Sequence, residues 1–360
     1  MDHELKAGKT KAWFLAACLA LVILGPGGAA VGAAQRTLTG VFEPEMIRIA
    51  DGSLYIVEGA NVLVYSLSDL RLKTKIGGKG EGPGELKVLD YWYNTLTVLP
   101  EHLFLDGYDK VVYFSKDGRF VKQMKKPIGI GKMAPLGSRF IGAKLDHLEG
   151  NVHYECLYLY DSDLKFIKEL CRQESPIQSM GRKTEMIPDV LNFSVWENRV
   201  YVERSREGFV IDVFDEQGSR IARIERPSEK IGVSKSHRDE SLEKFKSDPF
   251  VKRMGFEKFQ AFSQFVWPEV LPPIKDLTTA DGFIYVRTSK TLGDLEHWEI
   301  LDLQGRPQGD ADLPRIDTAP LMVHLYGVNY YAVRDGKLYY IKDNEKTDEW
   351  ELHVVEIKQR

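Results

Sequence analysis

A short unit that recurs six times along the 360-residue chain constrains its fold more than any other feature of the sequence. Each copy opens with a tight turn, Asp-Gly in three cases, and continues directly into an apolar strand rich in β-branched and aromatic residues. The opening segments of the six copies span residues 51–57, 101–105, 138–141, 197–202, 281–286 and 335–341. Because tight Asp-Gly turns between apolar runs are strong hairpin signals, each segment predicts the start of an antiparallel sheet.

A second apolar strand follows each opening segment, and five of the six copies continue through another turn into a more polar strand. The second apolar strands span residues 62–65, 111–114, 156–160, 210–214, 298–301 and 350–355. A further strand ahead of each opening turn completes a four-stranded unit. Four-stranded units repeated around an axis bury their faces against one another, which describes a propeller. The sequence therefore predicts an all-β, six-bladed β-propeller with four-stranded antiparallel blades.

The sixth unit stops after its third strand, whereas a strand-like run at residues 36–42 has no neighbouring partner in the sequence. We expect this N-terminal run to supply the outer strand of the last blade. That arrangement closes the ring and removes an exposed sheet edge, which is otherwise an aggregation liability. The alternative is a loose N-terminal arm.

The first unit ends in a Gly-rich stretch, residues 77–86, that closes with Gly-Pro-Gly-Glu-Leu. In this stretch and in its repeated units, the sequence resembles NHL-repeat-like six-bladed propellers and the bacterial exported six-bladed propeller proteins. The resemblance extends from about Val41 to Lys358, although the Gly-rich joint occurs only once. It implies a binding or interaction protein, and it names no substrate.

Residues 1–34 have the layout of a secretory signal peptide. Three lysines precede an apolar run over residues 12–24, and small residues at 31–34 offer a cleavage site. The run is shorter than the roughly 18–20 residues that cross a bilayer core. We therefore expect a propeller domain of residues 35–360 that is periplasmic or secreted at the bacterial cell envelope. An uncleaved membrane anchor is the alternative.

Cysteine chemistry is open at two places. Cys18 ends a lipobox-like segment, so lipidation there would tether the chain to a membrane, whereas the simpler interpretation makes it an apolar residue of the signal peptide. Cys156 and Cys171 flank a predicted hairpin turn, and an oxidising compartment would allow a disulfide between them. Two buried free thiols are the alternative, because the sequence does not determine the Cα separation that a disulfide needs.

The long connections are predicted to lie at one end of the ring. In a four-stranded blade, the links from strand one to two and from three to four share one end, and this sequence keeps them short. The links at the other end include long segments at residues 77–93, 145–154, 173–189, 227–273, 288–297 and 343–349. Long loops confined to one end are typical of binding surfaces, although insertions also accumulate by drift. We expect this end to engage a protein, peptide or glycan partner.

The largest insertion, residues 227–273, is predicted to be partly helical. Its apolar residues recur at helical spacing among lysines and glutamates, namely Leu242, Phe245, Phe259, Phe262 and Val266. Ser241 or Asp239 is the expected helix cap. The insertion is interpreted either as a lid or docking surface, or as packing that seals apolar side chains against the blades.

Charged residues also collect where the second strands are expected to end, near the mouth of the central channel. These are Glu58, Asp106, Lys144, Glu203, Arg204, Arg287 and Lys342. A ring of mixed sign there would suit a polar or zwitterionic ligand, or a calcium ion held by carboxylates. Strand-end charges are also what any solvated rim requires.

No catalytic constellation is visible in the sequence. It contains no H-E-x-x-H zinc motif, no G-x-S-x-G nucleophile elbow and no P-loop. The net charge of −4 argues against a nucleic-acid partner. The sequence therefore favours a binding protein without a cofactor. A metal-dependent hydrolase or lactonase-like propeller, and a structural scaffold in an envelope complex, are the alternatives.

Overall fold

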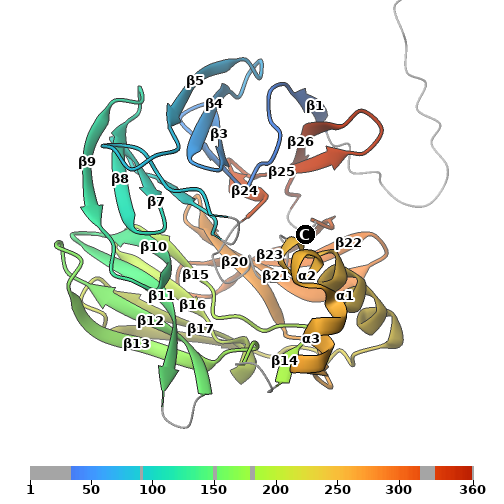
Figure 1. Ribbon diagram of the computed structural model, residues 1–360. Helices are drawn as coiled ribbons and strands as arrows, with labels where there is room; N and C mark the ends of the chain where they lie inside the picture. The colour runs from blue at the N-terminus through green and yellow to red at the C-terminus, as the bar shows by residue number, and fades with distance from the viewer. Residues whose placement is uncertain (1–33, 90–91, 149–151, 179–182, 317–328, 359–360) are drawn as a thin grey trace, which may run out of the picture. The chain divides into compact units, whose positions relative to one another are not determined.

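The computed structural model of the chain describes residues 34–89, 92–148, 152–178, 183–316 and 329–358. Six four-stranded antiparallel sheets follow one another around a ring (Figure 1), which confirms the predicted six-bladed β-propeller. Residues 1–33 of the predicted signal peptide, Cys18 included, lie outside the described residues. Among the described residues, none of the helices has both the length and the apolar character that a membrane crossing requires.

The first three blades place their strands outward in sequence order. Blade 1 contains β2 (Met46–Ala50), β3 (Ser53–Glu58), β4 (Asn61–Ser66) and β5 (Leu72–Gly77). Blade 2 contains β6 (Thr95–Val98), β7 (His102–Asp106), β8 (Lys110–Ser115) and β9 (Phe120–Lys125). Blade 3 contains β10 (Ile130–Leu136), β11 (Arg139–Leu148), β12 (Val152–Tyr160) and β13 (Phe166–Glu174).

The last three blades repeat this order, except that the outermost strand of blade 6 comes from the start of the chain. Blade 4 contains β15 (Phe193–Trp196), β16 (Arg199–Glu203), β17 (Phe209–Asp215) and β18 (Arg220–Arg226). Blade 5 contains β20 (Ile274–Ala280), β21 (Phe283–Leu292), β22 (Leu295–Asp302) and β23 (Pro307–Pro314). Blade 6 contains β24 (Tyr331–Arg334), β25 (Lys337–Asn344), β26 (Glu349–Glu356) and β1 (Ala34–Leu38).

The ring is closed by β1, as the sequence predicts. This strand pairs antiparallel with β26, from Ala34 opposite Val354 to Leu38 opposite Trp350. Leu38 is buried between blades 6 and 1, which fastens the clasp by packing as well as by hydrogen bonds. The strand ends earlier than expected, because the chain turns directly after Leu38.

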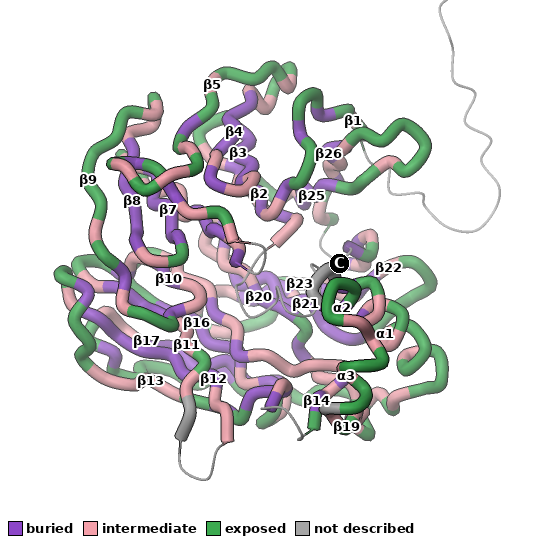
Figure 2. Tube along the Cα trace, in the orientation of Figure 1, coloured by how far each residue is buried: buried purple, intermediate pink, exposed green. Residues whose placement is uncertain are grey.

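One apolar core lies between each pair of neighbouring blades, so that six cores separate the six blades. Between blades 2 and 3, for example, the rings of Phe104 and Phe140 stack with centroids 5.9 Å apart. Alternate residues of a strand point to opposite faces, so each sheet contributes to two cores. Figure 2 shows this as buried inner strands and more exposed outer strands, such as β9 and β13. The first strands complete the ring, with contacts from β2 through β6, β10, β15, β20 and β24 back to β2.

The Asp-Gly turns have the backbone that tight hairpins require. Asp51 and Gly52 have φ values of 51° and 63°, and the equivalent turns at Asp281 and Asp335 also begin with positive φ. Two successive residues with positive φ match the right-handed twist of the flanking strands, which explains why Asp-Gly recurs there.

The structure corrects three of the predicted long loops. Segments 145–154 and 288–297 are mostly extended hairpin arms in their described parts, because β11 continues to Leu148 and β21 to Leu292, and segment 343–349 is shortened to the turn at 345–348 because β25 continues to Asn344. Their polar residues still pair across strands, since a strand can be polar where it extends beyond the apolar core. The long segments at this end of the ring are the blade-to-blade connections, and we call this end of the ring the long-connection end.

The insertion between blades 4 and 5 is partly helical, as predicted. It forms α1 (Lys235–Ser247), α2 (Pro249–Met254) and α3 (Phe256–Phe262), which Figure 1 shows gathered in one place. The helix cap differs from expectation, because α1 begins one turn earlier than Asp239. Ser234 Oγ accepts a hydrogen bond from His237 N at 3.2 Å, and His237 Nδ1 accepts one from Ser234 N at 3.1 Å.

The two cysteines of blade 3 are free thiols, so the structure contradicts the disulfide alternative. Cys171 lies opposite Leu157, which places Cys156 one residue out of register. Neighbouring residues of a strand point to opposite faces. Cys156 therefore packs in the core between blades 2 and 3, whereas Cys171 packs against the core between blades 3 and 4. Burial raises the pKa of Cys171 to about 12.

Candidate functional site

Asp106, one of the predicted ring charges, is buried in an ion pair. It lies at the end of β7 with 1% of its surface exposed, and its Oδ1 is 2.5 Å from Lys126 Nζ. Its other oxygen accepts a hydrogen bond from Met133 N of β10 at 2.7 Å. Burial raises the pKa of Asp106 and lowers the pKa of Lys126, and their mutual attraction opposes both changes. The pair thus joins blade 2 to blade 3.

Arg287 is likewise enclosed within its own blade. Its Nη2 donates to Glu296 Oε2 at 2.6 Å, and Glu296 Oε1 accepts a second hydrogen bond from Lys275 Nζ at 2.5 Å. The guanidinium also lies over the ring of Trp298, with Cζ 5.6 Å from the ring centroid. These partners satisfy the Arg287 charge inside blade 5.

The remaining predicted charges make local contacts on separate blades. Glu58 Oε1 accepts hydrogen bonds from Phe42 N at 2.6 Å and Glu43 N at 2.8 Å, which hold the connection from β1 to β2. Lys144 Nζ is 2.8 Å from Asp146 Oδ2, and Lys342 is exposed. Among the described residues, no hydrogen bond or ion pair joins two members of the predicted ring. Ligand binding by that ring stays a prediction.

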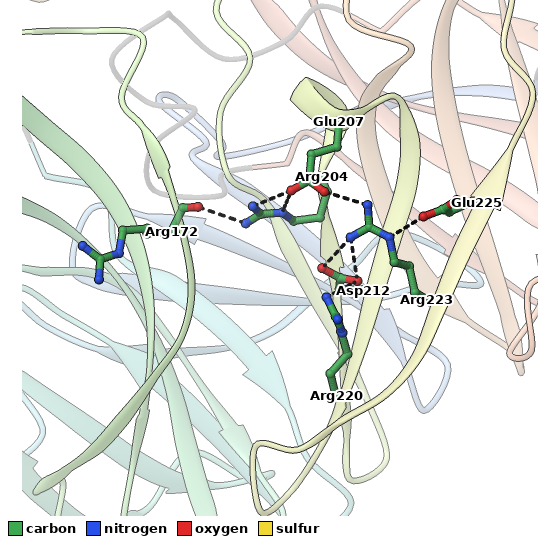
Figure 3. A network of polar contacts seen from close by, with 7 residues as sticks. All are labelled: Arg172, Arg204, Glu207, Asp212, Arg220, Arg223 and Glu225. Carbon is green, nitrogen blue, oxygen red and sulfur yellow. Dashed lines mark hydrogen bonds and ion pairs between the residues drawn. The ribbon is translucent and has the colours of Figure 1, made fainter.

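Arg204 belongs to a polar network on the outer part of blade 4 (Figure 3). Its Nη2 is 2.7 Å from Glu207 Oε1, and its Nη1 donates to the carbonyl oxygen of Arg172 on β13 at 3.2 Å. Arg223 on β18 reaches the other oxygen of Glu207 at 2.6 Å, and its Nη1 lies 3.4 Å from Asp212 Oδ1. The network therefore ties blade 3 to blade 4 at the long-connection end.

A second polar network, which the sequence does not predict, crosses the inner edge of four successive blades. Lys132 Nζ of β10 lies 3.4 Å from Asn192 Oδ1, just before β15. Asn192 Nδ2 donates to Asp276 Oδ1 of β20, and Tyr331 of β24 donates to Asp276 Oδ2 at 2.6 Å. Burial, with Arg48 nearby, lowers the pKa of Lys132 to about 8. The sequence feature that could have indicated this network is a charged residue inside an otherwise apolar first strand, as at Arg48 and Lys132.

The two longest described connections fold against each other. The strand β14 (Lys183–Glu185) pairs in parallel with β19 (Gln264–Val266), and Met186 N donates to Val266 O at 2.9 Å. Met186 is buried in an apolar cluster with Phe245 of α1 and Val251 of α2. Leu242, Phe245 and Phe259 of the predicted apolar stripe pack in or against this cluster. We call the described residues of 175–192 together with 227–273 the cap.

A pocket of about 310 Å³ lies between the cap and blade 4. Its blade side is formed by Ser205 and Arg206 of the short helix η2 (Ser205–Glu207). The apolar part of its lining comes from the cap and includes Ile187, Val266, Trp267, Pro268, Val270, Leu271, Pro272 and Pro273. The charged part of the lining consists of Lys183, Glu185, Asp189 and Arg206. We call this cavity the cap pocket.

The charges of the cap pocket are unevenly paired. Glu185 receives both cations, with Arg206 Nη2 at 2.9 Å and Lys183 Nζ at 3.4 Å from its carboxylate oxygens. Asp189 has no ion pair within the described part of the chain, and its Oδ1 is buried without a hydrogen-bond partner there. Burial raises the pKa of Asp189 to about 7, against the lowering effect of Arg206.

Two further carboxylates lie behind Asp189. Glu155 Oε2 accepts hydrogen bonds from Leu191 N at 2.6 Å and Gln173 Nε2 at 3.1 Å, and the same Gln173 amide donates to Asp189 O at 2.9 Å. Glu203, at the end of β16, is 3% exposed. One oxygen of each, Glu155 Oε1 and Glu203 Oε2, is buried and lacks a partner among the described residues.

Burial, together with repulsion between neighbouring carboxylates, raises the pKa of all three of these side chains. Burial raises the pKa of Glu155 to about 7 and that of Glu203 well above its usual range, and for Glu203 the nearby Asp189, Asp276 and Glu155 add to the increase. Within the described ranges, no three His, Cys, Asp or Glu side chains are grouped so that they would hold a metal ion. Calcium binding stays a prediction.

No protein-family model matches the sequence. No curated protein matches it either. Among solved structures, a DUF4221-family member from Bacteroides vulgatus is 10% identical with a TM-score of 0.49, covering 92% of this chain and 98% of that one. BamB from Moraxella catarrhalis is 10% identical with a TM-score of 0.32, covering 86% and 71%. The Pan2 WD40 domain of Neurospora crassa is 8% identical with a TM-score of 0.39, covering 89% and 91%. Because these TM-scores are all below 0.5, the evidence for the six-bladed architecture is the strand pairing of the chain itself.

Proposed function

We propose that this chain is an extracytoplasmic binding propeller that takes up a segment of a partner protein in the cap pocket. The observation that carries the proposal is the cap itself. Two connections that are far apart in the sequence fold together and leave a cavity of about 310 Å³ with apolar and charged lining. Concave sites with a mostly apolar lining and a few placed polar groups are typical of ligand binding.

Ring closure does not account for the cap. The six cores between the blades and the β1 clasp hold the propeller together, and the apolar cluster of the cap is separate from all of them. Surface insertions cost little entropy and need not fold against one another. Their joint folding, through β14 and β19, therefore supports a role for the cavity that they enclose.

The lining favours a peptide segment over a glycan. Trp267 is part-buried and donates its Nε1–H to Ser241 Oγ at 2.9 Å, and the guanidinium of Arg238 lies over its ring with Cζ 6.0 Å from the centroid, so that ring face is not free for a sugar to stack on. Around it, Val270, Leu271 and three prolines offer surface to apolar side chains, and the charged residues supply specificity. The extracytoplasmic setting is proposed from the signal-peptide layout of residues 1–34 alone.

The test is to select displayed peptides on the purified full chain and to measure their affinities for two variants. Trp267→Ala removes the largest apolar side chain of the cap pocket, and we expect it to weaken binding by about tenfold or more. Phe166→Ala is the matched control, because Phe166 is an aromatic residue that is 60% exposed and adjoins the short turn at 161–165. Peptides that lose affinity with Phe166→Ala but not with Trp267→Ala would place binding at the opposite end and refute the proposal.

A further inference from the structure

The chemistry of the proposed partner segment is indicated by the charge left over in the cap pocket. Both cations of the lining, Lys183 and Arg206, are paired with Glu185. Asp189 therefore faces the pocket as a carboxylate without a cation of its own among the described residues. Its buried Oδ1 accepts no hydrogen bond from them.

The carboxylates behind Asp189 strengthen this imbalance. Glu203 is 3% exposed and Glu155 is 6% exposed, and each has one buried oxygen that lacks a partner within the described residues. Both repel Asp189 electrostatically. Two arginines attract Asp189, and of these Arg206 lines the pocket whereas Arg204 does not. Buried polar atoms that lack partners are rare in folded proteins, and such an atom calls for a missing partner.

We infer that the cap pocket binds a basic side chain of the partner segment, a lysine or arginine flanked by apolar residues, with its cation at Asp189. The inference rests on the proposed function. The cation supplies a donor to Oδ1 of Asp189, a side chain that otherwise has a hydrogen bond with the Ser205 side chain and the charges of Arg206 and Arg204 near it. Charge-assisted hydrogen bonds of this kind are stronger than neutral ones. The flanking residues meet Trp267, Val270 and Leu271. A cavity of about 310 Å³ is at the small end for a ligand site, which suits one long side chain.

A bound cation also favours the ionised forms of Asp189 and the carboxyl groups beside it. Opposite charge favours ionised carboxylates, so the basic side chain releases protons from Asp189 and its neighbours when it binds. The charged groups that face Asp189 are Glu185 of β14, Glu155 of β12, Glu203 of β16, Arg204, and Arg206 of η2, and the Ser205 hydroxyl is hydrogen-bonded to it. A neutral side chain of the same length releases none.

The test uses the full chain and four blocked peptides, acetyl-Ala-Val-X-Leu-Pro-amide, in which X is arginine, lysine, norleucine or glutamate. Calorimetry in buffers of different ionisation enthalpy, near pH 7, gives affinity and proton release together. We expect the arginine or lysine peptide to bind about tenfold or more tightly than the norleucine peptide, with proton release. Asp189→Asn should reduce the basic peptides to the norleucine level, and Glu203→Gln should weaken them without affecting the norleucine peptide.

Glu229→Gln is the control, because Glu229 is an exposed carboxylate of the same insertion and is expected to leave every affinity unchanged. Equal affinities for the arginine and norleucine peptides would overturn the basic-side-chain inference while leaving the binding function intact. If peptide selection finds nothing that depends on Trp267, the proposed function itself fails. Free arginine amide binding as tightly as the arginine peptide would make the pocket a small-cation site and overturn the peptide assignment.

Discussion

Replacing Glu155 with glutamine measures how much the ionisation of this buried side chain, which lies behind the cap pocket, lowers the stability of the fold. The substitution preserves the existing contacts, because one oxygen of Glu155 accepts from Leu191 N and Gln173 Nε2 while the other has no partner among the described residues. A glutamine can therefore keep its carbonyl oxygen toward both donors and place its NH₂ group at the empty position. Shape and hydrogen bonding are conserved, and the ionisable group is lost.

The magnitude follows from the displaced pKa. Burial raises the pKa of Glu155 from 4.5 to about 7. Between those values the folded state keeps a proton that the unfolded state has released, so the stability supplied by this group falls as pH rises. A pKa difference of one corresponds to about 1.4 kcal/mol, so the loss amounts to about 3 kcal/mol once the pH exceeds 7. Glu155→Gln removes the loss, and the variant should exceed the wild type by about that amount at pH 8 and by nothing near pH 4.

Urea unfolding of wild type and variant across this pH range measures the effect directly. Glu174→Gln is the matched control, since Glu174 lies on the neighbouring strand β13 with its side chain exposed to water, and it should leave the pH dependence unchanged. Parallel stability curves for wild type and Glu155→Gln would refute the reasoning, because they would show that Glu155 ionises in the folded state as readily as in water.

Two further predictions concern the ring. Leu38→Ala should lower the free energy of unfolding by about 2–5 kcal/mol, since Leu38 is 1% exposed in the clasp, whereas Phe42→Ala, at a side chain 77% exposed, should change it by less than about 0.5 kcal/mol in the same urea titration. Gly305→Ala should lower the free energy of unfolding, measured by thermal unfolding, by about 2 kcal/mol or more, because φ is +83° and a Cβ would lie 2.6 Å from Ile224. Gly293→Ala, where φ is positive but the space is open, should lower it by only about 1 kcal/mol. Equal losses in the two variants would contradict the clash with Ile224.

The blades were predictable because their cores are built from local patterns. The turn of a hairpin and the apolar run that follows it are adjacent in the sequence, as at Asp51 and Gly52, and the number of such units determines the number of blades. The clasp was predictable for a related reason, since a strand was missing from one unit and spare elsewhere. The loop lengths were less accurate, because β11, β21 and β25 extend beyond the core with polar residues that resemble loops.

The site was much less accessible to sequence reasoning. The sequence places Asp106 at a strand end, but its partner Lys126 lies 20 residues later, and nothing in the sequence pairs them. The contacts of Asp276 with Asn192 and Tyr331 join residues 84 and 55 positions apart, and they exist only once the ring is closed. The cap pocket likewise depends on two connections that meet in space. The sequence identifies Glu203 as a strand-end charge, whereas its isolation from solvent arises only in the folded chain.

Hydrogen exchange of the full chain, with and without a selected peptide, tests most directly the claim that the long-connection end holds the partner. Binding in the cap pocket should slow exchange in residues 183–189 and 264–273, which contain most of its lining residues, and leave the short turns at 116–119 and 303–306 unchanged. Slower exchange at those short turns, with none in the cap, would contradict the account.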